Sequence, residues 1–117
     1  MTEPGREVAP DSEVRHEDWG GEELRQRTYT RVTFAEVDLS EVVTEGSTFE
    51  ECTFQGVRFN VSEHRSSAFL NCTFQRCSFF DTTFSGCKLV GSRFSDCTLD
   101  LLKVDGGDWS FAVLRGA

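Results

Sequence analysis

The sequence is poor in the residues and segments that mark several common classes of protein. Its 117 residues include two prolines, one methionine, one tyrosine and two histidines. No apolar run approaches the ~18 residues that span a membrane, and no charged segment followed by an apolar one opens the chain as in a secretion signal. Acids outnumber bases by twenty to twelve, which disfavours direct binding of nucleic acid. We therefore expect one cytoplasmic domain with no nucleic-acid or membrane partner.

Catalytic motifs are missing as well. The sequence contains no glycine-rich phosphate loop, no nucleophile elbow and no His-Glu metalloprotease helix. Its carboxylates fall at positions that are expected to face water, without an apolar pocket to tune their chemistry. We predict a non-enzymatic protein with no catalytic residue, no cofactor and no metal site.

What the sequence does contain is one unit that recurs every five residues, as in Cys52-Thr53-Phe54-Gln55-Gly56. An apolar centre follows a small residue two places earlier, and the other three residues are polar. The centres run from Phe34 to Leu114 without insertion. A period of five fits neither a helix nor an amphipathic strand, and a fixed period predicts a solenoid. The residues that we assign to its core include Phe34, Phe54, Phe74, Phe94, Cys52 and Cys72.

Three segments differ in how well they follow this repeat. Residues 1–21 carry prolines, glycines and acids without apolar periodicity, which predicts a disordered acidic tail with Trp19 as its one anchor. Residues 22–31 are partly in phase but have charged residues where small ones are expected, which predicts a degenerate capping unit. Residues 32–117 are predicted to form the solenoid.

All five cysteines occupy the small position before a centre, where Val, Ser and Thr also occur. An odd number of cysteines argues against a closed disulfide framework, so we interpret them as small buried side chains with free thiols. If coils repeat every twenty residues, disulfides between Cys52 and Cys72 and between Cys77 and Cys97 are the alternative.

Two of the centres, Thr44 and His64, are polar and lie twenty residues apart. Two interpretations stay open. They form a satisfied polar pair or a local outward bulge, or they mark a contact or metal site. The absence of Cys or carboxylate ligands at metal-ligand spacing favours the first.

The residue types at this period resemble the pentapeptide-repeat family. The resemblance implies an all-β fold, a right-handed quadrilateral β-helix with one pentapeptide per side and twenty residues per coil. Residues 32–117 would then form about four coils. Centres twenty residues apart, such as Phe34, Phe54 and Phe74, would stack on one side.

Acidic residues gather at two places along the repeat. We assign them to a partner-binding surface: Glu36, Asp38, Glu41, Glu45, Glu50 and Glu51 in the first coil, and Asp96, Asp100, Asp105 and Asp108 in the last. An acidic rod suggests a decoy for DNA, although acidic surfaces also keep proteins soluble. Residues 32–117 carry a net charge of −5, about one per ~4 Å of rod, against one per ~1.7 Å for B-DNA.

Several irregular stretches resemble the quinolone-resistance group of the pentapeptide-repeat family: residues 62–69, 71–74, 94–99 and 111–114. The resemblance covers the N-terminal part of such proteins. It implies a rod that binds DNA gyrase by mimicking its DNA segment, and that blunts fluoroquinolone action. The rival hypothesis is a scaffold or adaptor that holds another protein through Leu70, Val90 and Phe80.

The C-terminal end of the repeat is apolar and stops partway through a coil. An open β-helix end exposes unpaired backbone groups and invites another chain. Either the natural chain continues or two chains meet end to end, and we predict a homodimer through this end. The residues assigned to its interface are Leu102, Trp109, Phe111, Val113 and Leu114.

Overall fold

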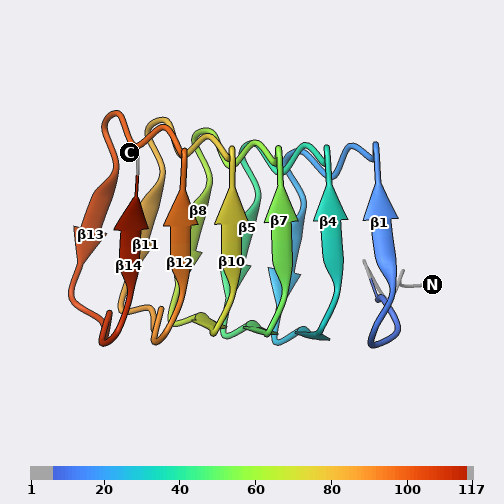
Figure 1. Ribbon diagram of the computed structural model, residues 1–117, viewed down its shortest axis with the longest axis horizontal. Helices are drawn as coiled ribbons and strands as arrows, with labels where there is room; N and C mark the ends of the chain where they lie inside the picture. Colours follow the sequence, from blue (N-terminus) through green and yellow to red (C-terminus); the bar gives the residue numbers. More distant parts are fainter. Residues whose placement is uncertain (1–6, 116–117) are drawn as a thin grey trace.

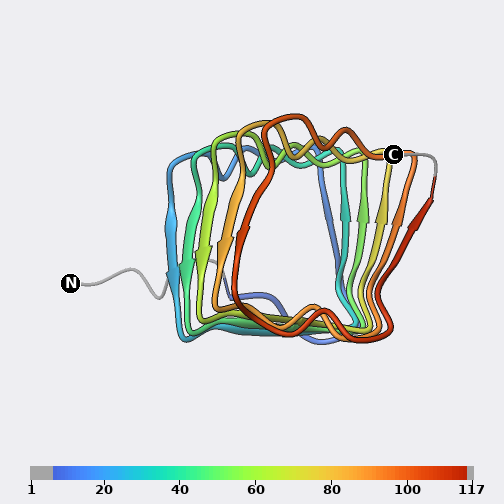
Figure 2. The same cartoon turned by 90° about the vertical axis from the view of Figure 1, so that its left-hand side faces the viewer.

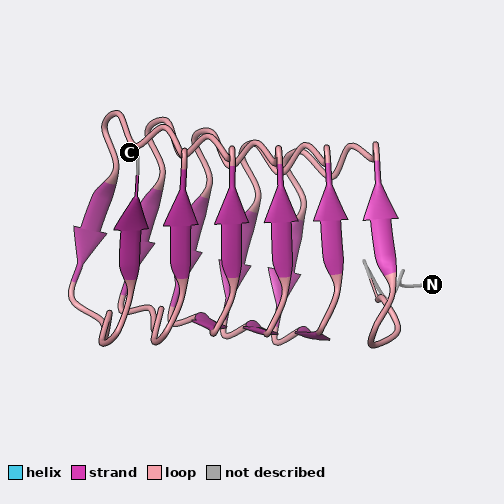
Figure 3. Cartoon of the chain, viewed as in Figure 1, coloured by secondary structure: helices cyan, strands magenta, loops and turns pink. Residues whose placement is uncertain are grey.

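The chain winds into a four-sided β-helix in which each coil takes twenty residues. The computed structural model describes residues 7–115. Figure 1 shows strands of successive coils side by side along the long axis, and Figure 2 looks onto the nearly rectangular coils. The described residues form strands, turns and loops but no helix, and so no helix that could span a membrane (Figure 3). The predicted all-β, four-sided helix is confirmed.

Three sides of the helix carry parallel sheets, and the other is held by single bridging residues. The first side has β1 (Glu13–Arg15), β4 (Thr33–Ala35), β7 (Thr53–Gln55), β10 (Thr73–Gln75), β12 (Arg93–Ser95) and β14 (Val113–Arg115). The second side is bridged through Asp18, Asp38, Arg58, Ser78 and Thr98. The third side has β2 (Glu23–Arg25), β5 (Val43–Glu45), β8 (Glu63–Arg65), β11 (Thr83–Ser85) and β13 (Lys103–Asp105). The fourth side has β3 (Thr28–Thr30), β6 (Thr48–Glu50) and β9 (Ala68–Leu70).

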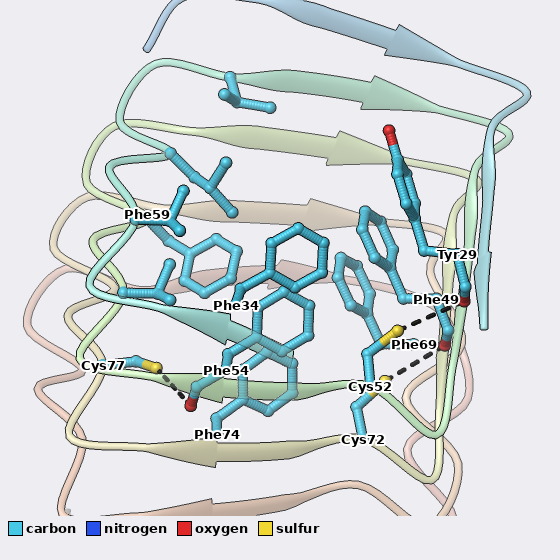
Figure 4. Close-up of a cluster of buried hydrophobic side chains, with 14 of the residues drawn as sticks. Tyr29, Phe34, Phe49, Cys52, Phe54, Phe59, Phe69, Cys72, Phe74 and Cys77 are labelled. Atoms are coloured by element: carbon cyan, nitrogen blue, oxygen red, sulfur yellow. Dashed lines mark hydrogen bonds between the residues drawn. The ribbon is translucent and has the colours of Figure 1, made fainter. Parts of the chain in front are cut away.

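The strands pair in a register of twenty residues, which stacks each centre on the centre of the next coil. Phe34, Phe54 and Phe74 align in this way. Their ring centroids lie 4.9 and 4.8 Å apart, with nearly parallel planes (Figure 4). The six residues that the sequence analysis names for the core are all buried, and buried aromatic pairs of this kind stabilise a fold beyond their area alone.

The small residue before each centre has a second role besides filling space. Where it is Cys, Ser or Thr, its side chain in most cases donates a hydrogen bond to the carbonyl oxygen 23 residues earlier, in the preceding coil. Cys52 donates to the Tyr29 carbonyl at 3.3 Å and Cys72 to that of Phe49 at 3.2 Å (Figure 4). All five cysteines are buried and free, and burial raises the pKa of the Cys72, Cys77 and Cys87 thiols. The thiols therefore serve as small donors.

The predicted disordered tail and capping unit are wrong for the described residues. Strand β1 pairs with β4 through Val14 and Phe34, and β2 and β3 pair in the same register with β5 and β6. Trp19 is 2% exposed and lies edge-on to Phe34 at 5.6 Å, as a centre of the second side. The stack therefore has just over five coils instead of four. Residues 1–6 of the predicted tail lie outside the described residues.

The added coil escaped the sequence pattern because its small positions hold Glu17, Glu22 and Arg27. In later coils this position is small because its side chain must fit against the preceding coil. No described residue lies 23 positions before these three, so that constraint is relaxed. Only the centres Val14, Trp19, Leu24 and Tyr29 keep the repeat, and all four are buried.

Each corner of the coil is turned by the residue two places after a centre, in the left-handed region. Fifteen of these residues are not glycine. Asn and Asp adopt this conformation with little penalty, but Val61, at a φ of 61°, is β-branched and strained there. The backbone N–H of Val61 donates to the Phe80 carbonyl at 2.8 Å, so stacking of the coils holds the corner in place.

Replacing Val61 by asparagine should raise the free energy of unfolding by about 1 kcal/mol, because asparagine tolerates the left-handed region better. Asn71 already turns a corner at a φ of 54°. Chemical denaturation measures the effect. The control is Val43→Asn within β5, which should destabilise the protein because it replaces a β-branched residue in a strand. A loss of stability in Val61→Asn would contradict the proposed strain.

Candidate functional site

The acids assigned to the first predicted coil are distributed around the rod instead of lying on one face. Glu36 and Glu41 turn the two corners that flank the second side, where Asp38 is a bridging residue. Glu45 and Glu50 lie on the third and fourth sides, in β5 and β6. A coil turns through all four sides in twenty residues, so neighbours in sequence face different directions. The structure does not bring these acids together as one surface.

Arginines neutralise about half of this set. Arg58 lies 3.9 Å from Asp38, and Arg25 lies 3.6 Å from Glu45. Arg31 lies 3.9 Å from Glu51 and contacts Asp11 more closely. Among the described residues, the remaining three acids form no ion pair: Glu36, Glu41 and Glu50. Exposed ion pairs contribute little stability, but they lower the charge that a partner meets.

The second side and its two corners hold the densest group of acids. Asp18 and Asp38 are bridge partners in adjacent coils, which places their Cα atoms about 4.8 Å apart. Glu36 and Glu41 flank Asp38, and Arg58 is the one base opposite it on this side. We call Asp18, Glu36, Asp38 and Glu41 the acidic patch. Sequence reasoning missed Asp18 because it had been assigned to the tail.

Backbone groups hold the two aspartates of the acidic patch in place. Asp38 accepts a hydrogen bond from the Ser40 N–H at 2.9 Å, and Asp18 accepts one from the Gly20 N–H at 2.8 Å. The hydrogen bonds from Ser40, with help from the Arg58 charge, lower the pKa of Asp38. Local bonds of this type are common where aspartate begins a turn. Asp38 is therefore a structural residue as well as an acidic one.

The charge of the molecule is divided along the rod. Residues 7–51 contain thirteen acids and four bases, a net charge of −9. Residues 52–115 contain six acids and seven bases, a net charge of +1. The N-terminal half of the rod therefore carries the acidity of the whole chain.

The acids predicted at the other end are scattered over different sides and corners of the rod. Asp96 turns a corner, Asp105 lies in β13 and Asp108 bridges to Lys88 on the fourth side. The hydrogen bonds from Ser110 lower the pKa of Asp108. Asp100 follows the second side at a different corner from Asp96. These residues do not form a second acidic patch.

The C-terminal end leaves apolar centres uncovered, in contrast to the N-terminal coil. Val104 and Leu114 are 49% and 51% exposed, whereas Val14 and Leu24 are 6% and 1% exposed. The residues predicted for the oligomer interface lie here: Leu102 and Trp109 are half-buried, and Phe111, Val113 and Leu114 are exposed. Strands β13 and β14 each form the last strand of a sheet.

The polar centres Thr44 and His64 are buried in one hydrogen-bonded network. One ring nitrogen of His64 lies 2.9 Å from the Thr44 hydroxyl, and the other lies 2.9 Å from the Ser62 hydroxyl. Thr44 continues to Ser67 at 2.9 Å. The two arms end on carbonyl oxygens, at Phe59 and Arg65. This is the satisfied polar pair of the first interpretation.

Burial keeps His64 neutral. Its imidazole is 1% exposed, stacks on Phe84 at 4.9 Å and contacts Phe59 and Phe69 edge-on. No carboxylate is part of the network, so burial lowers the pKa of His64 to about 3. Within residues 7–115, no group of three or more His, Cys, Asp or Glu side chains could hold a metal ion.

Comparison with known proteins places these features in a wider group. Residues 23–99 match the sequence profile of the family described as the SV2A/B/C luminal domain. The chain is 44% identical over 88 residues to the pentapeptide repeat protein MfpA of Mycobacterium tuberculosis, covering 75% of this chain and 48% of that protein. It is 47% identical over 58 residues to MfpA of Mycolicibacterium smegmatis, covering 50% of this chain and 28% of that protein. The chain thus spans less than half the length of these relatives.

Solved structures show the same fold in more distant sequences. The crystal structure of the pentapeptide repeat protein Rfr23 from the cyanobacterium Cyanothece superposes with a TM-score of 0.81 at 10% identity, covering 90% of this chain and 87% of that one. At this level of identity the likeness concerns the fold alone.

Buried neutral His64 should make stability depend on pH. The folded state holds its pKa at about 3 and the unfolded chain near 6.5, so the unfolded state binds more protons as the pH falls below about 6.5. The stability that His64 contributes is complete above that pH and is lost progressively towards pH 3. From pH 7.5 to 5 the loss should be about 2 kcal/mol.

Chemical denaturation at pH 7.5 and 5 measures this loss. The double substitution Thr44→Leu and His64→Phe should remove this pH dependence, because the buried imidazole is gone. It should leave no buried hydroxyl without a partner, because Ser62 and Ser67 keep their carbonyl acceptors. His16→Gln removes the other histidine, which is exposed at a corner, and serves as the control. An unchanged pH dependence in the double variant would show that His64 is not responsible.

Proposed function

Because the chain belongs to the pentapeptide-repeat proteins and to the SV2A/B/C luminal-domain family, we propose that it acts by binding a protein partner through its acidic N-terminal coils. The proposed partner is DNA gyrase, and the coils take the place of DNA on it. The observation that carries this proposal is the division of charge, with −9 in residues 7–51.

The density of charge in these coils is that of a nucleic acid. Forty-five residues make about two and a quarter coils, which rise about 11 Å along the rod at the usual spacing of strands. A net charge of −9 then gives one negative charge per ~1.2 Å, against one per ~1.7 Å in B-DNA. A protein surface that attracts DNA by its phosphates would attract these coils too.

The acidic patch concentrates part of this charge on the second side of the rod and its two corners. Glu36 and Glu41 are exposed and form no ion pair with a described base, so their full charge is presented to a partner. Asp18 and Asp38 lie between them, fixed by backbone hydrogen bonds. Charges that are held in place before binding cost less conformational entropy when a partner arrives.

The protein acts by occupancy and not by catalysis, and it works in the cytoplasm, where its partner is found. By competing with DNA it modulates gyrase and protects it from fluoroquinolones. The chain spans less than half of its MfpA relatives, so the activity of a whole protein of that kind is part of the proposal.

A second candidate function is that of a non-catalytic scaffold for another protein. Three apolar residues are exposed close together in successive coils: Val61, Phe80 and Leu101, at 46%, 43% and 63%. Val61 and Leu101 turn the same corner, with Asp81 between them and Phe80 beside Asp81. Leu70 and Val90, predicted for this role, are half-buried and offer less surface. An unbiased pull-down dominated by a partner other than gyrase, and lost on Phe80→Glu, would favour the scaffold.

The exposed C-terminal end supports a proposed homodimer. Its uncovered centres, Val104 and Leu114, and the free edges of β13 and β14 are features that proteins normally bury or pair. A second copy meeting this end would cover both.

Reversing charge in the acidic patch tests the gyrase proposal. The double substitution Glu36→Lys and Glu41→Lys should weaken binding to gyrase by about tenfold or more at low salt, because it removes charge that the partner's basic surface attracts. Surface plasmon resonance at two salt concentrations, with a supercoiling assay in parallel, measures this. The difference between wild type and variant should shrink at high salt.

The matched control is Glu50→Lys with Asp105→Lys. It changes the net charge by the same amount on the fourth and third sides of the rod, outside the acidic patch. We expect it to retain most of the affinity. Equal losses in both double variants would contradict a localised patch, and no binding of the wild type at micromolar concentration would contradict the function itself.

Light scattering coupled to size exclusion tests the homodimer. The 13.2 kDa chain should elute with twice that mass, and Phe111→Asp with Leu114→Asp should return it to one chain, because charge is costly to bury in an interface. Circular dichroism checks that the variant stays folded. A monomeric wild type at high concentration would rule out this interface.

A further inference from the structure

A groove near the C-terminal end of the first side gathers basic and hydroxyl side chains. It has a volume of about 470 Å³ and is lined mainly by Thr73, Gln75, Arg93, Ser95, Val113 and Arg115. These residues come from three neighbouring strands, β10, β12 and β14. No acid lines the groove, although acids outnumber bases in the chain as a whole.

The two arginines are placed to act on one ligand. The register pairs Arg93 with Val113 and Ser95 with Arg115, so the arginines lie on a diagonal between adjacent strands. Their Cα atoms are then about 8 Å apart. Both side chains face outward from the same sheet, and their guanidinium groups can reach the space between them.

Both arginines lack the acid partner that six other arginines of the rod have, and of the described arginines only Arg76, at a corner, shares this lack. At the other end of the same side, Arg15 contacts Glu13 in its own strand at 2.9 Å, and Arg65 contacts Glu63 on the third side in the same way. In β14, Val113 occupies the strand position that Glu13 has in β1. In β12, Arg93 itself occupies that position, and Ser95 stands where β1 has Arg15. Arg93 and Arg115 form no ion pair with any residue of 7–115. Asp96, the nearest acid in sequence, turns the adjoining corner and does not line the groove.

We propose that this groove binds a phosphate group, either free phosphate or a phosphate monoester. Two guanidinium groups supply paired donors that match the oxygens of an oxyanion. The hydroxyls of Thr73 and Ser95 and the amide of Gln75 add donors around them. A phosphate has three or four acceptor oxygens and uses more of these donors than a carboxylate with two. The site lies outside the acidic coils, so it does not depend on the proposed function.

Titration of the labelled protein with inorganic phosphate, followed by NMR of the backbone amides, tests the proposal. Saturable shifts are expected at residues 73–75, 93–95 and 113–115. Glycerol phosphate in a second arm should bind more tightly if a monoester is the natural ligand. Acetate in a third arm should bind more weakly than phosphate. Equal binding of acetate and phosphate would overturn the assignment to phosphate.

Substitutions distinguish a specific phosphate-binding site from general electrostatic attraction to basic residues. Arg93→Gln and Arg115→Gln should each weaken binding about tenfold, since a hydrogen bond to a charged group is lost. Arg93→Lys keeps the charge but not the planar fork, and should also weaken binding. The control is Arg65→Gln, the same change on the opposite side of the rod, which should have little effect. Wild-type affinity in Arg93→Lys, or equal losses in Arg65→Gln, would overturn the proposal.

Discussion

Stacking of one coil on the next, in a register of twenty residues, is the constraint on which the rest of the structure depends. Backbone N–H groups donate to the coil on either side, as Thr53 does to Val32 and Gly56 does to Gln75. The same register puts Phe54 within 4.9 Å of Phe34 and 4.8 Å of Phe74. Neither set of contacts exists within one coil, so a coil is stable only when it stacks on at least one neighbour. The strained corners persist because the stack holds them.

This constraint explains how much the sequence could predict. Inward positions are restricted by two neighbours, so the centres from Phe34 onward repeat clearly, and the sides and columns follow from counting in fives and twenties. The coil of residues 7–26 has a neighbour on one side only among the described residues. Its small positions are free to hold Glu17 and Glu22, and the pattern that depends on small residues fails there. Proline and glycine in this stretch then suggested a tail, although Val14 and Trp19 were in phase.

The polar centres show a different limit. Counting predicted that Thr44 and His64 would be stacked, and the register confirms it. It could not predict that Ser62 and Ser67 would supply the remaining partners, because Ser67 reaches Thr44 from 23 residues away. A buried imidazole with both nitrogens bonded costs far less than an unsatisfied one, so the network removes the need for a ligand. The two polar centres, which the sequence left open as a candidate site, are buried side chains whose hydrogen bonds are satisfied within the core.

The missed coil also changes what the charge implies. Counted from residue 32, the rod carries −5 over about 20 Å and is a poor imitation of DNA. The coil of residues 7–26 adds seven acids and two arginines at one end, and the density there reaches that of a duplex. Because inward positions alone specify the fold, outward positions of the same coils can differ freely in charge. The same repeat can therefore carry an acidic surface at one end and, at the other, Arg93 and Arg115 without ion-pair partners, while the core contacts stay the same.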